Sequence, residues 1–235
     1  MTPALHRLER TPSTMDVLHQ LAAEGAEPGT AVVAAEQSGG RGSRGRHWES
    51  PLGGLWLSVL YRPQSAARVE LMSLRVGLMA AAALDDIGEP AVRLKWPNDL
   101  LLDDRKLGGI LCEARWQGDA LAWMVVGIGL NVVNPVPDGA VRLGERHPSL
   151  TPERLLPGLL TRLRALDAGN VPLTAEELSH FAARDWLCGR RIKAPVAGVA
   201  EGIGEDGALL VRGSGGATTA LRAGSVELAD TAARP

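Results

Sequence analysis

The spacing of apolar residues along the chain predicts four helices. Residues 15–24 and 66–87 carry apolar side chains every three to four positions, and a glycine follows each stretch. A third helix is expected to open at Thr151, with Pro157 bending or shortening it. A fourth is expected to run through Leu187 behind a Thr-x-x-Glu capping box.

Shorter apolar runs between these helices predict strands. They occupy residues 30–37, 54–62, 92–96 and 120–128, and a further pair of strands is expected to form a hairpin around residues 103–105. From Gly189 onward the sequence is rich in glycine and turn residues, which favours a small barrel of short strands. This change of character predicts a domain boundary near Cys188.

Composition and charge narrow the classes of function. The chain has 235 residues, 45% of them hydrophobic, and a formal net charge of -2, so it lacks the basic field that sequence-independent nucleic-acid binding requires. Two cysteines are too few for a disulfide framework or a metal knuckle. The N-terminus lacks the apolar core of a signal peptide, and the apolar part of residues 120–137 is too short to span a membrane, so a cytoplasmic protein is expected.

Lysine is rare in this chain, and its placement is informative. Among 25 basic residues only Lys95, Lys106 and Lys193 are lysine. The first two lie in the stretch LKWPNDLLLDDRKLGGIL, with Asn98 between them. Because the chain uses arginine elsewhere, an ammonium group on a flexible stem is expected to have a specific task in this stretch.

The stretch SGGRGSRGR, residues 38–46, has the G-x-G-x-x-G spacing of a dinucleotide-binding loop. That motif must lead into a helix, whereas here a strand is expected next. The chain lacks the Gly-Lys-Ser or Gly-Lys-Thr of a P-loop, and one Phe and one Tyr offer few platforms for RNA bases. The glycines instead favour close backbone approach to a ligand whose phosphate or carboxylate is bound by Arg41, Arg44 and Arg46, the plain alternative being a solvated surface loop.

Three ordered motifs decide between these alternatives. SGGRGSRGRHWESPLGGLWLS, KWPNDLLLDDRKLGGIL and VVGIGLNV together resemble biotin protein ligase, and the match runs from about Ser13 to the C-terminus. The resemblance implies an α+β fold: a mixed β-sheet flanked by helices, related to class II aminoacyl-tRNA synthetases, over residues 1–187, and an SH3-like barrel over 188–235. No helix-turn-helix precedes the match, so a monofunctional enzyme that does not bind DNA is expected.

The resemblance also implies the reaction. The carboxylate of biotin attacks the α-phosphate of ATP to give biotinyl-adenylate, with Mg²⁺ on the phosphates, and a lysine of a carboxylase carrier domain then takes the biotin. Two anions must meet in the first step, and by resemblance Lys106 and Arg41 supply the fixed positive charge. Asp99 could orient or deprotonate the acceptor amine, or it could cap a turn.

Further residues match the family's contacts one by one. The implied biotin contacts are Ser13, Thr14, Met15, Gln37, Arg41, Gly42, Ser43, Lys106, Gly127 and Gly129. The implied contacts to ATP or the adenylate are Arg41, Arg44, Arg46, Trp48, Lys95, Asn98 and Asn131, and Mg²⁺ is expected near Lys95, Asn98 and Asn131. Trp48 and Trp96 either form the walls of the ligand pocket or pack in the core, and Asn131 could instead form a turn after a strand.

Two positions depart from the family's pattern. Ser43 stands where an arginine or lysine is common, which leads to the hypothesis that the adenylate is held more weakly. Met15 stands where many members have asparagine, so a direct polar contact is not expected there. His47, beside the loop, is interpreted as structural or exposed rather than as a base.

Other functions compete with this one. A lipoate or octanoate ligase of the same superfamily would share the chemistry, but its arginine-rich triple-glycine signature is absent and KWPND is present. A non-catalytic biotin sensor conflicts with the retained Lys106. The expected partner is therefore a biotin carboxyl carrier protein, with no membrane partner, and a homodimer is left open.

Overall fold

The computed structural model describes residues 3–63, 69–167, 169 and 171–229. Its largest part is a mixed sheet of seven strands in the order β1-β2-β3-β7-β6-β5-β4. β1 runs parallel to β2 and all other neighbours are antiparallel. The strands are β1 Leu5–Thr11, β2 Ala31–Gln37, β3 Leu55–Tyr61, β4 Arg93–Lys95, β5 Asp99–Leu102, β6 Arg105–Gln117 and β7 Ala120–Leu130.

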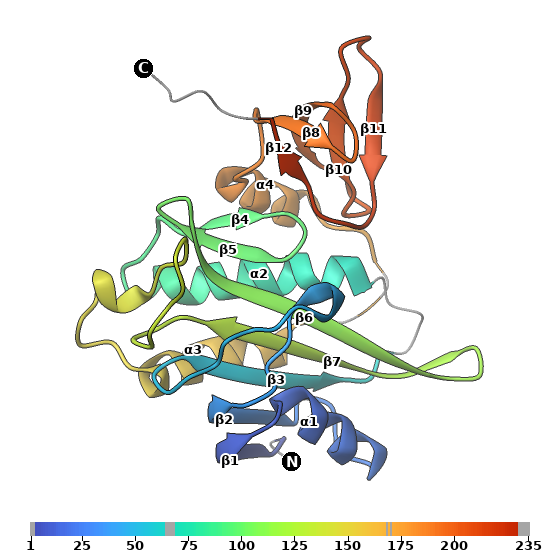
Figure 1. The fold of residues 1–235 in the computed structure, drawn as a ribbon. Helices are drawn as coiled ribbons and strands as arrows, with labels where there is room; N and C mark the ends of the chain where they lie inside the picture. The colour runs from blue at the N-terminus through green and yellow to red at the C-terminus, as the bar shows by residue number, and fades with distance from the viewer. Residues whose placement is uncertain (1–2, 64–68, 168, 170, 230–235) are drawn as a thin grey trace.

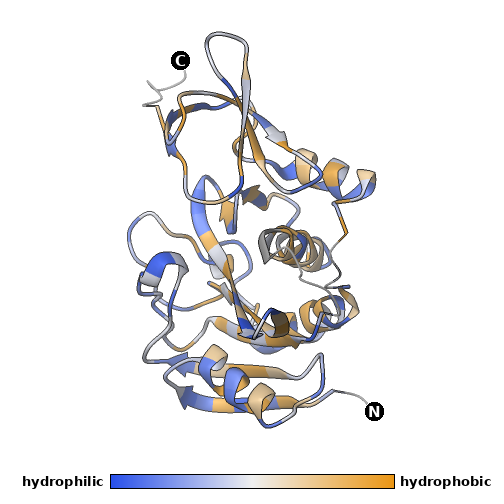
Figure 2. Cartoon of the chain, turned by 90° about the vertical axis from the view of Figure 1, so that its right-hand side faces the viewer, coloured by the Kyte–Doolittle hydropathy of each residue, from blue (hydrophilic) through white to orange (hydrophobic). Residues whose placement is uncertain are grey.

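Helices cover both faces of this sheet (Figure 1). They are α1 Thr14–Ala23, α2 Val69–Asp85, α3 Pro152–Ala165 and α4 Ala175–Arg184, with short 3₁₀ turns at Ser43–Gly45 and Leu143–Glu145. α1 closes a small core of its own around Leu18, Val32 and Val125, whereas α2 and α3 bury the opposite face. Figure 2 shows hydrophobic residues in the central strands and in the helices that pack on them. The predicted mixed sheet flanked by helices is therefore confirmed.

The C-terminal segment forms a separate antiparallel sheet in the order β11-β10-β9-β8-β12, which lies beside α4 and β4 (Figure 1). Its strands are β8 Arg191–Ala194, β9 Gly198–Ile203, β10 Leu209–Arg212, β11 Thr218–Leu221 and β12 Glu227–Leu228. The C-terminal β-structure predicted from the turn-rich sequence is thus present as a five-stranded sheet. None of the helices within the described residues is long and apolar enough to cross a membrane.

Most predicted elements occur where they were expected, with three differences. β1 was not predicted. α3 continues unbroken through Pro157, because the proline is exposed while leucines such as Leu156 and Leu160 bury the other side of the helix. α4 ends at Arg184 instead of Leu187, because the chain then turns and the backbone N–H of Trp186 donates to the carbonyl of Leu94 on β4. Residues 66–68 of the second predicted helix lie outside the described residues.

Trp96 joins the two sheets. It is 3% exposed in the main core, and its indole N–H donates at 2.9 Å to the carbonyl of Gly207, in the turn between β9 and β10 of the C-terminal sheet. Of the two alternatives for Trp96, the structure supports core packing.

Trp96→Phe is expected to lower the free energy of unfolding by about 2 kcal/mol, because it leaves a cavity and an unpaired carbonyl at the junction. Urea denaturation of both proteins measures the difference. Trp116→Phe is the matched control, since Trp116 is 53% exposed and should change stability by less than about 0.5 kcal/mol. Equal effects of the two substitutions would contradict this role of Trp96.

Candidate functional site

A pocket of about 400 Å³ lies between the loop of residues 38–46, called the arginine loop below, the start of α1 and the strands β3, β6 and β7. Most of the predicted site residues line it. They are Ser13, Thr14, Met15, Gln37, Arg41, Gly42, Ser43, Arg46, Trp48, Asn98, Asp99, Lys106, Gly127, Gly129 and Asn131. Two predicted residues, Arg44 and Lys95, do not line it. Unpredicted lining residues include His47, Glu49, Trp56, Leu57, Gly109, Ile110, Leu111 and Ile128.

A buried hydrogen-bond network fixes the polar end of the pocket. The Oε1 atom of Gln37 accepts bonds from the backbone N–H and the hydroxyl of Thr14, at 2.8 and 3.0 Å, and its Nε2 donates to Ser50 Oγ at 2.9 Å. Because the single hydroxyl proton of Thr14 goes to Gln37, the bond of 2.8 Å between Thr14 and Ser58 must have Ser58 as the donor. Neighbouring Ser13 caps α1, its hydroxyl accepting from the backbone N–H of Met15. Ser50 and Ser58 lie within the motif of residues 38–58, but no local feature of that stretch indicates that their hydroxyls contact Gln37 and Thr14.

The strands carry glycine where the pocket requires space. A Cβ atom on Gly127 would lie 2.8 Å from Met15 Sδ, and one on Gly129 would lie 2.7 Å from Trp48 Nε1. Met15 is thus an apolar wall packed on Gly127, as expected from the absence of asparagine at this position. Trp48 lies over Gly129 and its buried indole N–H has no protein partner among the described residues.

Arg41 is held by two carboxylates. Its Nε donates to Glu113 Oε1 at 2.8 Å, and its Nη2 donates to Glu113 Oε2 at 3.2 Å and to Asp16 Oδ1 at 2.7 Å. Hydrogen bonds from His19 and Arg41 lower the pKa of Glu113 from 4.5 to about 2. The same contact with Glu113 raises the pKa of Arg41, so its charge is permanent. Sequence inspection missed Asp16 and Glu113, because neither belongs to a recognisable motif.

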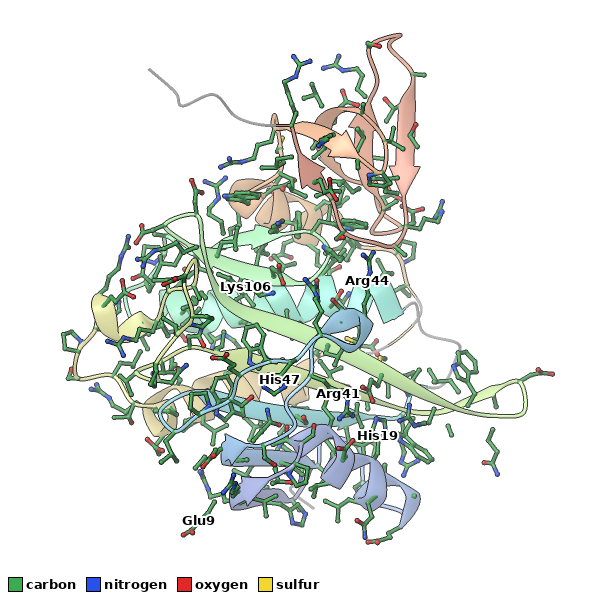
Figure 3. All side chains as sticks on the ribbon, viewed as in Figure 1. Glu9, His19, Arg41, Arg44, His47 and Lys106 are labelled. Atoms are coloured by element: carbon green, nitrogen blue, oxygen red, sulfur yellow. The ribbon has the colours of Figure 1, made fainter. Side chains whose placement is uncertain are left out.

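Lys106 is the second fixed cation of the pocket. Its Nζ donates to Asp99 Oδ1 at 2.7 Å and lies 5.2 Å from the centre of the Trp48 ring. Lys106 and Arg41 both line the pocket, and Figure 3 shows that they come from different elements. Asp99 starts β5 directly opposite β6, so the KWPND and DRKLGG motifs meet across one antiparallel ladder. Within the pocket, the Asp99 carboxylate is therefore the direct partner of Lys106.

The three arginines of the loop separate in the structure. Arg46 donates to the carbonyl and the hydroxyl of Ser43, at 3.3 and 3.0 Å, and stays at the pocket. Arg44 has a left-handed backbone, with φ of 62°, and donates instead to Ser225 Oγ at 3.0 Å in the C-terminal part of the chain. Only two arginines of the loop therefore line the pocket. The next regular element after the loop is the strand β3, whereas a dinucleotide-binding turn leads into a long helix, so the G-x-G-x-x-G spacing does not mark such a turn here.

Two asparagines lie at the pocket with defined amide orientations. Asn131 Oδ1 accepts a bond of 3.1 Å from Asn134, so its own NH₂ group is the part left for a ligand. Asn98 has the opposite orientation, because its Nδ2 donates to the Ile110 carbonyl at 2.7 Å and leaves Oδ1 for a ligand. Lys95 lies elsewhere, with its Nζ 5.2 Å from the centre of the Trp186 ring. The predicted cluster of Lys95, Asn98 and Asn131 is thus not brought together as a whole.

Comparisons with known proteins agree on one family. The model of the biotin/lipoate A/B protein ligase family matches residues 8–131. The chain is 36% identical over 230 residues to a biotin--[acetyl-CoA-carboxylase] ligase of Paracoccus denitrificans, covering 89% of this chain and 94% of that protein. It is also 36% identical over 201 residues to the bifunctional ligase/repressor BirA of Escherichia coli, covering 80% of this chain and 63% of BirA.

A solved structure extends the likeness to the fold. The biotin protein ligase from Aquifex aeolicus in complex with biotin and ATP superposes with a TM-score of 0.78 at 26% identity, covering 97% of this chain and 99% of that chain. The likeness therefore includes the C-terminal sheet as well as the large one.

The ion pair of Glu113 should be visible in the acid stability of the protein. A carboxyl whose pKa is lowered in the folded state stabilises that state above its unfolded pKa of about 4.5, and the contribution is lost as the pH falls toward 2. We therefore expect Glu113→Gln to make the fall in the free energy of unfolding between pH 5 and pH 2 shallower, as measured by urea denaturation at each pH.

Glu9→Gln is the matched control, because it removes the same charge from an exposed position on β1, away from Arg41 (Figure 3). It should leave the slope close to that of the unmodified protein. An identical slope for Glu113→Gln and Glu9→Gln would show that the Glu113 contacts do not stabilise the fold.

Proposed function

Because the chain belongs to the biotin/lipoate A/B protein ligase family, we propose that it joins biotin to a lysine of a carboxylase carrier protein in two ATP-dependent steps. The observation that carries the proposal is the placement of two cations, Arg41 and Lys106, on the wall of one pocket. The proposed partner is a biotin carboxyl carrier protein or domain, and the proposed location is the cytoplasm, where ATP and such carriers meet.

The pocket has two chemically distinct parts that suit biotin. Thr14 and Gln37 line the pocket and belong to the hydrogen-bond network with Ser58, so their polar groups can satisfy the ureido ring. Met15 and Leu57 belong to the apolar lining, which suits the sulfur ring and the aliphatic chain of biotin. A ligand with one polar end, an apolar body and a terminal carboxylate therefore matches the pocket.

In the first step a carboxylate oxygen of biotin attacks the α-phosphorus of ATP. A bond forms between this oxygen and phosphorus, the bond to the bridging oxygen breaks, and biotinyl-adenylate and pyrophosphate result. The repulsion between carboxylate and phosphate is the main obstacle, and Lys106 and Arg41 reduce it with charges already fixed by Asp99 and Glu113. Arg46 and the NH₂ group of Asn131 are further donors for phosphate oxygens.

In the second step the neutral amine of the carrier lysine attacks the carbonyl carbon of the mixed anhydride. An amide bond forms, AMP leaves with the bonding electrons, and the amine loses a proton. Asp99, the pocket carboxylate that binds Lys106, is the group that orients this amine.

Mg²⁺ fits this site as an ion carried mainly by ATP. No group of three or more His, Cys, Asp or Glu side chains that could hold a metal occurs within the described residues. Asn98 Oδ1 and the carboxylate of Glu49 are pocket oxygens that would contact it, which agrees with the preference of Mg²⁺ for one or two protein ligands plus substrate phosphates. When bound, the ion supplies charge neutralisation on the phosphates.

The direct test is the transfer of biotin to a purified carrier domain. With biotin and MgATP, mass spectrometry should show one added biotinyl group, and a carrier whose acceptor lysine is replaced by arginine should stay unmodified. Absence of modification of the intact carrier, or equal modification with ATP omitted, would contradict the proposed function.

Lys106→Ala is expected to reduce adenylate formation at least about a hundredfold, because it removes a preorganised charge from the site where the two anions meet. Pyrophosphate release in the presence of biotin measures this step, and circular dichroism checks the fold. Lys193→Ala is the matched control, since Lys193 is exposed on β8 of the C-terminal sheet. Near-normal release by Lys106→Ala would remove Lys106 from its proposed role.

Ser43 leads to a prediction about retention of the intermediate. Ser43 is a neutral lining residue whose hydroxyl is occupied by Arg46, so it provides no charge for the adenylate phosphate. In a single turnover without carrier, the protein should release free biotinyl-adenylate, and Ser43→Arg should slow this release several-fold by adding a phosphate partner. Undetectable release from the unmodified protein would refute weak retention.

A further inference from the structure

Arg41 is the end of a chain of contacts that reaches well beyond the pocket. Glu113, on β6, binds Arg41 with both carboxylate oxygens and also binds His19 on α1, with 3.0 Å between Glu113 Oε2 and His19 Nε2. Trp123, on β7, donates its indole N–H to His19 Nδ1 at 3.0 Å. The contacts thus join the loop, α1, β6 and β7, and Figure 3 shows His19 beside Arg41.

The direction of the hydrogen bonds along this chain is determined by chemistry. An indole N–H can only donate, so Nδ1 of His19 must accept and carries no proton. The ring proton is therefore on Nε2, which donates to Glu113 Oε2. Trp123 consequently selects the one neutral form of His19 that supports the Glu113 carboxylate.

The contacts among Arg41, Glu113 and His19 are more buried than ordinary surface ion pairs. The side chain of His19 is 10% exposed and that of Glu113 is 21% exposed, whereas Asp16, the other partner of Arg41, is 58% exposed. Arg115 also lies near Glu113 Oε2, but at 3.6 Å and on a side chain that is 50% exposed. Of the two carboxylates that bind Arg41, the more buried one is thus Glu113, which His19 and Trp123 support.

We propose that Glu113, His19 and Trp123 are positioning residues, which hold the Arg41 guanidinium at the pocket wall so that its charge is in place before the ligands arrive. The guanidinium has five N–H donors, and the clamp uses Nε and Nη2, so Nη1 is left for the reacting anions. A charge that is already fixed avoids reorganisation when carboxylate and α-phosphate meet. The expected effect on kcat rests on the proposed function, whereas the fixed position of the Arg41 guanidinium does not.

The kinetic test compares substitutions along the chain of contacts in biotin-dependent pyrophosphate release. Glu113→Gln and His19→Leu should each lower kcat about tenfold and change the KM for biotin little, since an unfixed Arg41 still attracts the ligand but is misplaced in the transition state. Trp123→Phe keeps the packing and should lower kcat about threefold through loss of the indole donor. His19→Gln should restore most of the rate, because its amide can donate to Glu113 and accept from Trp123.

Glu177→Gln is the matched control for loss of a carboxylate. Glu177 binds Arg75 in the same two-point geometry, Nε to Oε1 at 2.7 Å and Nη2 to Oε2 at 3.3 Å, but it lies on α4 outside the pocket. It should affect stability without lowering kcat. Equal rates for Glu113→Gln, His19→Leu and the unmodified protein, or a His19→Gln rate as low as that of His19→Leu, would overturn the proposal.

A spectroscopic measurement keeps the inference separate from the proposed function. In protein labelled with ¹⁵N-arginine, the Nε–H signal of Arg41, assigned by its loss in Arg41→Lys, should be resolved and protected from exchange, and should lose protection in Glu113→Gln and His19→Leu. Protection that is unaffected by both substitutions would overturn the positioning role even in an active enzyme. Protection that follows the prediction in a protein that does not activate biotin would contradict the proposed function alone.

Discussion

The fixing of two cations at one pocket is the interaction on which the rest of this structure depends. Arg41 is held by Glu113 and Asp16, and Lys106 is held by Asp99. Each cation has a carboxylate partner that sets its position while leaving other N–H groups for a ligand. A site that must bring two anions together requires charge whose position does not have to be found during the reaction. The neutral network around Gln37 and Thr14 also lines the pocket, and its hydrogen bonds are likewise in place without a ligand.

The fold supplies this arrangement through two long neighbouring strands. β6 and β7 pair over most of their length, with Gly109 opposite Gly129 and Leu111 opposite Gly127. Because these glycines have no Cβ atom, Met15 and Trp48 can pack directly against the backbone of the sheet. The strand β6 carries both Lys106 and, further along, Glu113, the carboxylate that binds Arg41. One rigid strand therefore positions one cation directly and the other through its partner.

Local sequence patterns predicted much of the fold and part of the site. Capping residues, helical spacing and turn glycines located four helices and most strands, because these signals act within one element. They missed β1, an edge strand that pairs in parallel with β2, because apolar and polar residues do not alternate regularly in its sequence LHRLERT. The motifs gathered most lining residues correctly. Arg44 and Lys95 were assigned to the ligand by motif membership, but their neighbours Ser225 and Trp186 come from distant parts of the chain.

The partners that orient the site could not be predicted for the same reason. Glu113, His19 and Trp123 are separated by up to 104 positions, and each is unremarkable in its local stretch. Only the sheet register and the docking of α1 bring them together.

The measurement that tests the central claim most directly is ATP–pyrophosphate exchange with biotin, lipoate and octanoate supplied separately to the purified protein. A pocket built to activate the carboxylate of biotin predicts exchange with biotin and little with the other two acids. Exchange with lipoate or octanoate in preference to biotin, or exchange with none of the three, would contradict it.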